Sequence, residues 1–207
     1  MVAKRFSEEQ VALLGPIVDR LLTMIGAARD AFNRHSRNRL EELQSLKSIV
    51  AQAGHDAARQ LKSLIGRQPA DEQTNLQRVH GTLDHLIIIG DQIGGCTAPI
   101  EQKIRGNILF SDKAVTQANF LFDQHTGIIR SVLDIFKTDN DFLKKYVLEE
   151  SRKLAQACLT FATEHEERLI EGLCQPQAAP IFLALLDRMG AVAQQEVNIA
   201  SLLVGKP

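Results

Sequence analysis

VALLGPIVDRLLTMIGAARDAF (residues 11–32) spaces its apolar and small side chains as one buried face of a long helix does. They recur at alternating steps of three and four residues: Val11, Leu14, Val18, Leu21, Ile25, Ala28 and Phe32. This spacing keeps them on one side of an α-helix and is typical of a helix packed in a bundle. Pro16 lies within the run, so it either bends the helix or marks where the helix truly begins.

The same spacing returns about 104 residues later in the chain. Adding 104 to each position gives Val115, Ala118, Phe122, His125, Ile129, Val132 and Phe136, with one polar member. The next segment repeats too, because AQA occurs at 51–53 and again at 155–157. A repeat of this length indicates two copies of one structural unit. We therefore predict two three-helix units, residues 1–106 and 107–207, packed as one body.

Capping and loop residues place the ends of six long helices. The expected ranges are approximately 8–35, 38–66, 71–105, 112–137, 140–171 and 178–203. Ser7 with Gln10 fits a capping box, Ser36 or Asn38 can cap the second helix, and GRQPADEQ (66–73) indicates a loop. Long helices joined by short loops pack antiparallel. The predicted fold class is all-α, with two tandem three-helix bundles.

Composition favours a reduced, cytoplasmic protein that binds no nucleic acid. The 24 basic residues balance 25 acidic ones, without the basic stripe of a nucleic-acid binder. No continuous apolar run approaches the roughly 18 residues that indicate a membrane span. Cys96, Cys158 and Cys174 are odd in number and lack C-x-x-C spacing, which predicts free thiols. Motifs for a nucleophile, a catalytic zinc or a phosphate loop are absent, so we expect no enzyme and no catalytic residues.

Three stretches, mainly in the second half, are similar to a known family. They are ILFSDKA (108–114), EHEERLIEGLCQPQAAPIFLALL (164–186) and VNIA (197–200). They resemble segments of the PhoU family, the bacterial phosphate-uptake regulators, and most closely its cytoplasmic domain in sodium/phosphate cotransporter-type proteins. The resemblance implies a regulatory domain that docks on a phosphate transporter or a sensor kinase. In a longer protein the partner would be a membrane domain of the same chain, at the inner face of the plasma membrane.

The resemblance also implies a metal signature, E(D)xxxD, on helices three and six. In the family these carboxylates bind iron, zinc or other cations. Here Asp91 keeps one of the four carboxylates, while Ile87, Gly190 and Gln194 occupy the other positions. Hard cations need several carboxylates, so a multinuclear cluster is not expected and no cofactor is required.

Asp91 leaves two interpretations open. With Asp84 or His80, which lie along the same helix face, it could form a residual site for a divalent metal or iron. Alternatively, these side chains face solvent or pair with Arg or Lys of a neighbouring helix, which is the interpretation we favour.

The remaining polar residues also allow two interpretations each. His125 and His165 both fall on seam positions, either as a facing metal-binding or pH-sensitive pair or as histidines at a bundle edge, each with one hydrogen bond. RHSRNR (34–39) either grips phosphate or an anionic lipid surface, or is a solvated helix end. The rival functions are a metal-binding helical protein and a self-associating module that forms a homodimer.

Overall fold

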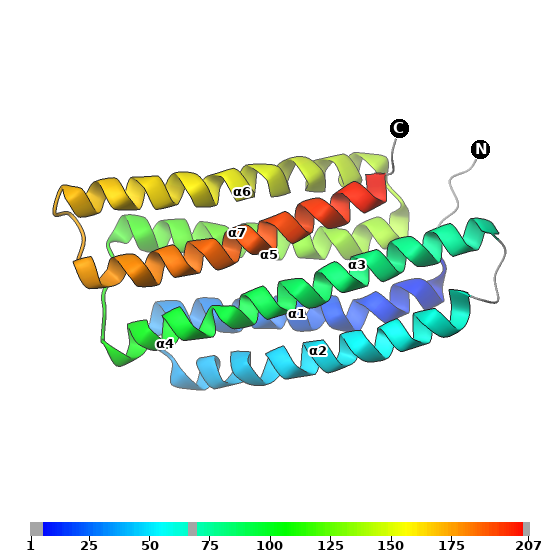
Figure 1. The fold of residues 1–207 in the computed structure, drawn as a ribbon, viewed down its shortest axis with the longest axis horizontal. Coiled ribbons are helices and arrows are strands. Elements are labelled where there is room, and N and C mark those ends of the chain that lie inside the picture. Colours follow the sequence, from blue (N-terminus) through cyan, green and yellow to red (C-terminus); the bar gives the residue numbers. More distant parts are fainter. Residues whose placement is uncertain (1–5, 66–69, 205–207) are drawn as a thin grey trace.

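Long helices make up the computed structural model, which describes residues 6–65 and 70–204 and contains no strands within those ranges (Figure 1). They are α1 (Glu8–Arg34), α2 (Arg37–Ile65), α3 (Ala70–Gly95), α4 (Thr97–Arg105), α5 (Asp112–Thr138), α6 (Asp141–Ile170) and α7 (Ala179–Val204). A short 3₁₀ turn, Pro176–Ala178, precedes α7. The predicted all-α bundle of long helices is confirmed.

Two layers of helices are visible along the length of the bundle (Figure 1). Helices α1, α2 and α3 pack together in the first half, and α5, α6 and α7 pack together in the second. The halves meet where α3 lies against α7 and α1 lies against α5. The predicted boundary at 106/107 falls in the connection between α4 and α5. One buried core cluster spans both halves, and the division into two domains stays a prediction.

Both repeated seams form the core of the bundle. Val18 and Phe32 are buried on α1, and Phe122 and Phe136 are buried at the equivalent positions of α5, 104 residues later. Each such side chain contributes about 1.5–3 kcal/mol when it is removed from water. The seams therefore stabilise the contact on which the two halves are joined.

Side-chain caps fix the predicted helix starts. The Gln10 backbone N–H donates to Ser7 Oγ (3.3 Å) and the Ser7 N–H donates to Gln10 Oε1 (3.1 Å), which confirms the capping box. Ser36, rather than Asn38, caps α2 by accepting from the Arg39 N–H (3.4 Å). The loop expected at 66–73 falls partly outside the described residues, and its last part is already helical because α3 begins at Ala70.

Two prolines bear on the predicted helix boundaries. Pro16 lies inside α1, so it does not mark the beginning of that helix. The helix expected over 71–105 is divided at Cys96 into α3 and α4. Pro99 explains the division, because proline lacks an N–H and its ring collides with the carbonyl of the residue four positions earlier, here Gly95.

Helix α1 is long and apolar enough, by length and composition alone, to cross a membrane. It is the one helix among the described residues that meets this criterion. The sequence did not indicate one, because its apolar residues form no continuous run of that length. The side chains of the buried face, from Leu14 to Phe32, form the core, and this explains the apolar composition of α1.

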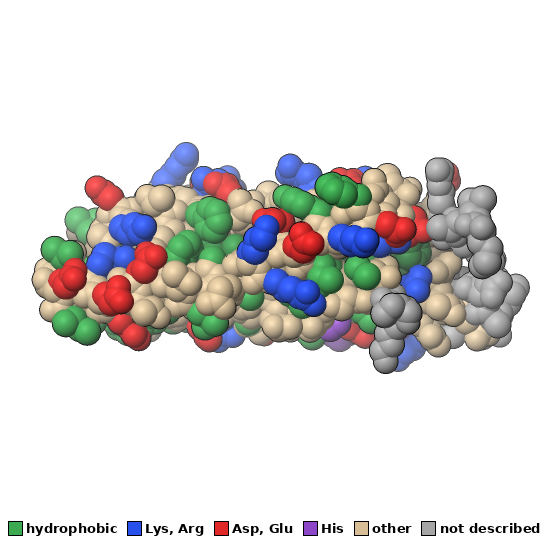
Figure 2. All heavy atoms as spheres, turned by 90° about the horizontal axis from the view of Figure 1, so that it is seen from above, with side chains coloured by type: hydrophobic (Ala, Val, Ile, Leu, Met, Phe, Trp, Pro, Cys, Tyr) green, Lys and Arg blue, Asp and Glu red, His purple; other side chains and the backbone are tan. Residues whose placement is uncertain are grey.

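The surface over α6 carries charges of both signs among apolar side chains (Figure 2).

Candidate functional site

The predicted metal ligands lie on α3 and form two separate contacts. His80 Nδ1 is 3.0 Å from Asp84 Oδ2, one turn along the same helix. Asp91 Oδ1 instead pairs with the Lys47 ammonium of α2, at 2.8 Å. Asp91 thus pairs with a lysine of a neighbouring helix, which is one of the alternatives to metal binding given above. Metal binding by His80, Asp84 and Asp91 stays a prediction.

The donors present do not fit the metal cluster that the family resemblance implies. Ile87 and Gly190 offer no donor atom at two signature positions. At a third, the Gln194 side-chain amide donates to Asn198 Oδ1 (3.2 Å). Among the side chains that the structure describes, those of residues 6–63 and 73–204, no three His, Cys, Asp or Glu are grouped so that they could hold a metal ion.

Side-chain size at these positions differs between the two halves. In the first half, Ile87 of α3 fills the space over Gly54 of α2, where an added Cβ would lie 2.5 Å from Ile87 Cδ1. The repeat counterparts are Cys158 of α6 and Gly190 of α7, so the larger side chain is missing from the last helix. An added Cβ at Gly190 would lie 3.5 Å from Cys158 Cβ, which is ordinary contact.

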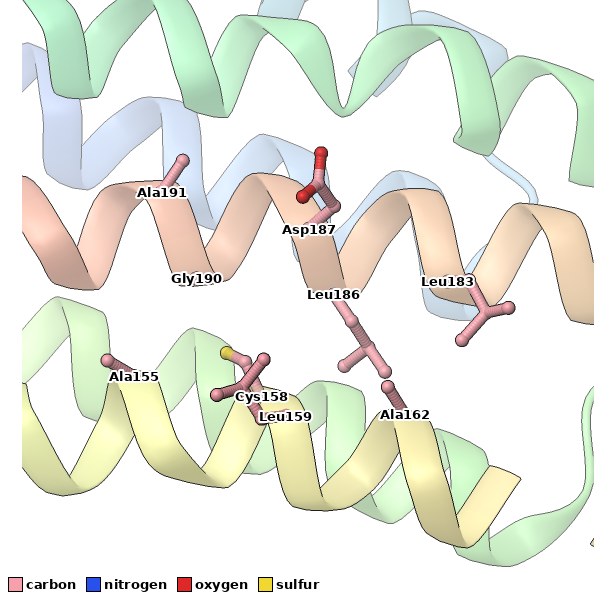
Figure 3. Close-up of a pocket in the computed structure, with 9 residues that line it drawn as sticks. All are labelled: Ala155, Cys158, Leu159, Ala162, Leu183, Leu186, Asp187, Gly190 and Ala191. Carbon is pink, nitrogen blue, oxygen red and sulfur yellow. The ribbon is translucent and has the colours of Figure 1, made fainter. Parts of the chain in front are cut away.

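This difference leaves a groove of about 510 Å³ between α6 and α7 (Figure 3). Its lining residues are Ala155, Cys158, Leu159, Ala162, Leu183, Leu186, Asp187, Gly190 and Ala191. Apart from Asp187, whose carboxylate points away from α6, the lining carries no charge (Figure 3). The groove can therefore accept an apolar group.

A second, polar hollow of about 560 Å³ lies between α3 and α7, where the two halves meet. It is lined by Thr74, Gln77, Arg78, His85, Asn198, Ser201 and Leu202. His85 Nδ1 lies 2.8 Å from Gln195 Oε1 and joins the two helices. No carboxylate is among the lining residues, and Arg78 forms no ion pair within the described part of the chain. This arrangement of donors suits an anionic group, because guanidinium donates two parallel hydrogen bonds.

A buried polar contact joins α5 to α7. His125 Nδ1 lies 2.9 Å from Glu196 Oε1, and the two side chains are 1% and 0% exposed. Burial raises the pKa of the Glu196 carboxyl above its ordinary value, although His125 opposes part of this effect. His165 has other neighbours, since its ring lies 4.8 Å from that of Phe182. The two histidines therefore have different neighbours, and both are buried, at 1% and 0% exposed, rather than at an edge of the bundle.

The basic segment 34–39 is largely neutralised by carboxylates. Arg39 pairs with Asp30 (3.2 Å) and Glu42 (2.6 Å), and Arg34 lies 4.0 Å from Asp30. These exposed pairs contribute little to stability. Since two of these arginines already have carboxylate partners, the segment fits a solvated helix end better than a phosphate-binding site.

Lys103 of α4 is an unusual buried cation behind this segment. Its side chain is enclosed, with 4% of the residue exposed, and its ammonium lies 5.0 Å from the centre of the Phe32 ring. The ammonium also contacts Nε2 of His35, the left-handed residue that ends α1. Burial lowers the pKa of Lys103 to about 8. No carboxylate pairs with it among the described residues.

All three cysteines are free, as predicted. Burial raises the pKa of both the Cys96 and the Cys158 thiol to about 12. Such thiols remain protonated near neutral pH and are poor nucleophiles. Cys174 is partly exposed, and its Sγ lies 3.9 Å from the His165 carbonyl oxygen.

Sequence reasoning missed Glu196 and Lys103, although a signal for each existed. Glu196 continues a three-and-four spacing on α7 after Met189 and Val192. Lys103 follows Ile100 by three residues on the buried side of α4. Because charged residues are rarely buried without a partner, the spacing alone did not predict that either side chain is buried. The groove had no sequence signal of its own, since it depends on the size of residues that meet across two helices.

Comparison with known proteins shows similarity in structure and not in sequence. No protein-family model matches the chain, and no curated protein matches it. PhoU from Pseudomonas aeruginosa superimposes with a TM-score of 0.86, at 14% identity, over 95% of this chain and 94% of that one. The phosphate transport system regulatory protein PhoU from Streptococcus pneumoniae superimposes with a TM-score of 0.82, at 14% identity, over 95% and 91%. The fold of this chain is therefore that of the PhoU proteins.

Proposed function

We propose that this chain regulates phosphate uptake or phosphate signalling by docking on a partner protein. The carrying observation is the shared fold, which extends over 95% of this chain and more than nine-tenths of two PhoU structures. The stretches 108–114 and 164–186, which resemble PhoU segments, support the same proposal. The partner we propose is a phosphate transporter or a sensor kinase. In a longer cotransporter-type protein, its own membrane domain would take that place.

Docking suits the chemistry of the described residues better than catalysis does. The His125–Glu196 contact is enclosed, and burial keeps the Cys96 and Cys158 thiols protonated. The groove beside α6 and the polar hollow beside α3 are both open to the surface and both lined by α7. Open concave surfaces of this kind can bind a group presented by a partner protein. We place this contact in the cytoplasm, at the inner face of the plasma membrane.

The experiment is affinity capture from membranes of the source organism, grown with ample and with limiting phosphate. The proposal predicts that wild-type protein retains a phosphate transporter or a sensor kinase, in an amount that changes with phosphate supply. If the polar hollow is the contact, Arg78→Glu lowers this retention, while Arg130→Glu, an exposed change on α5, does not. Failure to retain either class of protein under both conditions would contradict the proposal.

A further inference from the structure

We propose that the polar hollow between α3 and α7 binds the phosphate group of a small anion, either free phosphate or a phosphate monoester, through Arg78 and Asn198. This inference assigns a ligand to the hollow and does not depend on the docking partner proposed above. It rests on two features of the contact between the halves: a series of polar pairs that ends at Arg78, and a set of hydrogen-bond donors without a carboxylate among them.

Polar side chains of α3 and α7 pair with each other at steps of seven residues. Arg188 Nη1 of α7 donates to Gln92 Oε1 of α3 (3.0 Å). Seven residues earlier on α3 and seven later on α7, His85 Nδ1 lies 2.8 Å from Gln195 Oε1. The steps run in opposite directions because the two helices are antiparallel (Figure 1). At both levels the chain supplies a donor and its acceptor.

The next step of seven brings Arg78 of α3 to the level of Leu202 of α7. Leu202 reaches α3 at this end, because a Cβ added to Gly81 would lie 3.0 Å from Leu202 Cδ1. Leucine accepts no hydrogen bond. Arg78 is half-buried, and no hydrogen bond or ion pair joins it to any residue that the structure describes. The chain therefore provides a guanidinium here without an acceptor for it.

Asn198 offers a second donor, from the other helix. It lies one turn before Leu202 and lines the same hollow. Its Oδ1 accepts from Gln194 Nε2 (3.2 Å), which leaves its own amide N–H groups available. Thr74 and Gln77 of α3 add exposed donors at the rim. A ligand in the hollow thus meets donors from both halves of the molecule.

The charge and size of the hollow favour a phosphate group. None of the described residues that line it is Asp or Glu, so the positive charge of Arg78 is not neutralised there. A guanidinium can donate two parallel hydrogen bonds, which occupy both oxygens of a carboxylate. A phosphate keeps further oxygens for the donors of α7. The volume of about 560 Å³ also leaves room for the organic part of a monoester beside Leu202.

This site is separate from the predicted metal ligands. His80, Asp84 and Asp91 do not line the hollow, although they lie on the same helix. Because its donors come from α3 and α7, a bound phosphate would connect the two halves where they meet. A ligand that binds only the folded chain also stabilises it, in proportion to the logarithm of its concentration.

Isothermal titration calorimetry of the purified chain is the test, in phosphate-free buffer at constant ionic strength. The probes are inorganic phosphate, glycerol 3-phosphate and succinate. We expect saturable binding of a phosphate compound, and the tighter of the two identifies the source of the phosphate group. Succinate, which offers only carboxylates, should bind at least about tenfold more weakly.

Three variants test the residues. Arg78→Gln removes the charge and should raise the dissociation constant for phosphate at least about tenfold. Arg130→Gln is the matched control, because Arg130 is an exposed arginine of α5 without an ion pair among the described residues, and it should change nothing. Leu202→Glu supplies from within the chain the acceptor that Arg78 lacks, so it should weaken binding although every donor remains. Circular dichroism checks that all three variants fold.

Four results would overturn the proposal: no binding by the wild type at millimolar phosphate, succinate binding as tight as phosphate, equal binding by Arg78→Gln and Arg130→Gln, or unchanged binding by Leu202→Glu. No transporter or kinase takes part in these titrations, so such a failure would leave the proposed regulatory function standing. A failure to capture a partner from membranes would, in turn, leave the titration results unchanged.

Discussion

Gly54→Ala tests the observation that the first half fills its own groove. Alanine normally stabilises a helix interior by about 1 kcal/mol relative to glycine. At Gly54 the new methyl group would lie 2.5 Å from Ile87 Cδ1 and closer still to Cγ1, so Ile87 or the backbone of α2 must move. Overpacking of this kind costs about 1–3 kcal/mol, and β-branched Ile87 has few alternative rotamers. After the gain of about 1 kcal/mol is subtracted, we expect a net loss of up to about 2 kcal/mol.

Gly26→Ala is the control, because no neighbouring atom lies within 4 Å of the position that its Cβ would take. It should stabilise the protein by about 0.5–1 kcal/mol. The free energies of unfolding come from urea titrations followed by circular dichroism. In an Ile87→Ala background, Gly54→Ala should lose its penalty and behave like Gly26→Ala. Equal effects of the two glycine substitutions in the wild-type background would refute the packing argument.

Three further predictions concern buried and exposed charges. Because burial lowers the pKa of Lys103 from 10.5 to about 8, its charged form costs stability below pH 8, and the loss recedes as the pH rises towards 10.5. Lys103→Met should therefore stabilise the protein at pH 7 by up to about 3 kcal/mol in urea unfolding; a destabilised variant would contradict this. Burial, and to a smaller extent the charge of Arg168, lower the pKa of His165 in the folded protein. The unfolded chain therefore binds the proton more readily, and the stability should fall as the pH drops through about 6.5. His165→Leu, which copies Leu61 of the first half, should reduce that loss between pH 7.5 and 5.5; an unchanged pH dependence would argue against it. Cobalt titration followed by absorbance should give the same result for wild type, Asp84→Asn and Asp91→Asn, whereas loss of binding in the variants would establish the residual metal site.

The periodic residues made most of the fold predictable. The seam that begins at Val11 and its copy at Val115 lie on the buried sides of α1 and α5, as their spacing indicated. Ser7 and Ser36 cap their helices because a hydroxyl can accept from a free N–H in the first turn. The break at Cys96 was missed because the apolar spacing continues past it, while the proline that causes it lies three residues later.

The candidate site was less predictable because it depends on contacts between helices. Asp91 stood out in the sequence, but only the packing of α2 against α3 gives it Lys47 as a partner. The groove arises from Cys158 and Gly190 together, on two helices, and neither residue is informative alone. The loss of the metal signature was visible directly, since it required only the residue types at the aligned positions.

Phosphate uptake in the source organism tests the central claim most directly. The measurement is the rate of labelled phosphate uptake, with ample and with limiting phosphate, in cells with the gene, without it, and with it restored. Regulation by this protein predicts a changed uptake rate in the deleted strain and a normal rate after restoration. An uptake rate that is the same in all three strains, with ample and with limiting phosphate, would contradict the account.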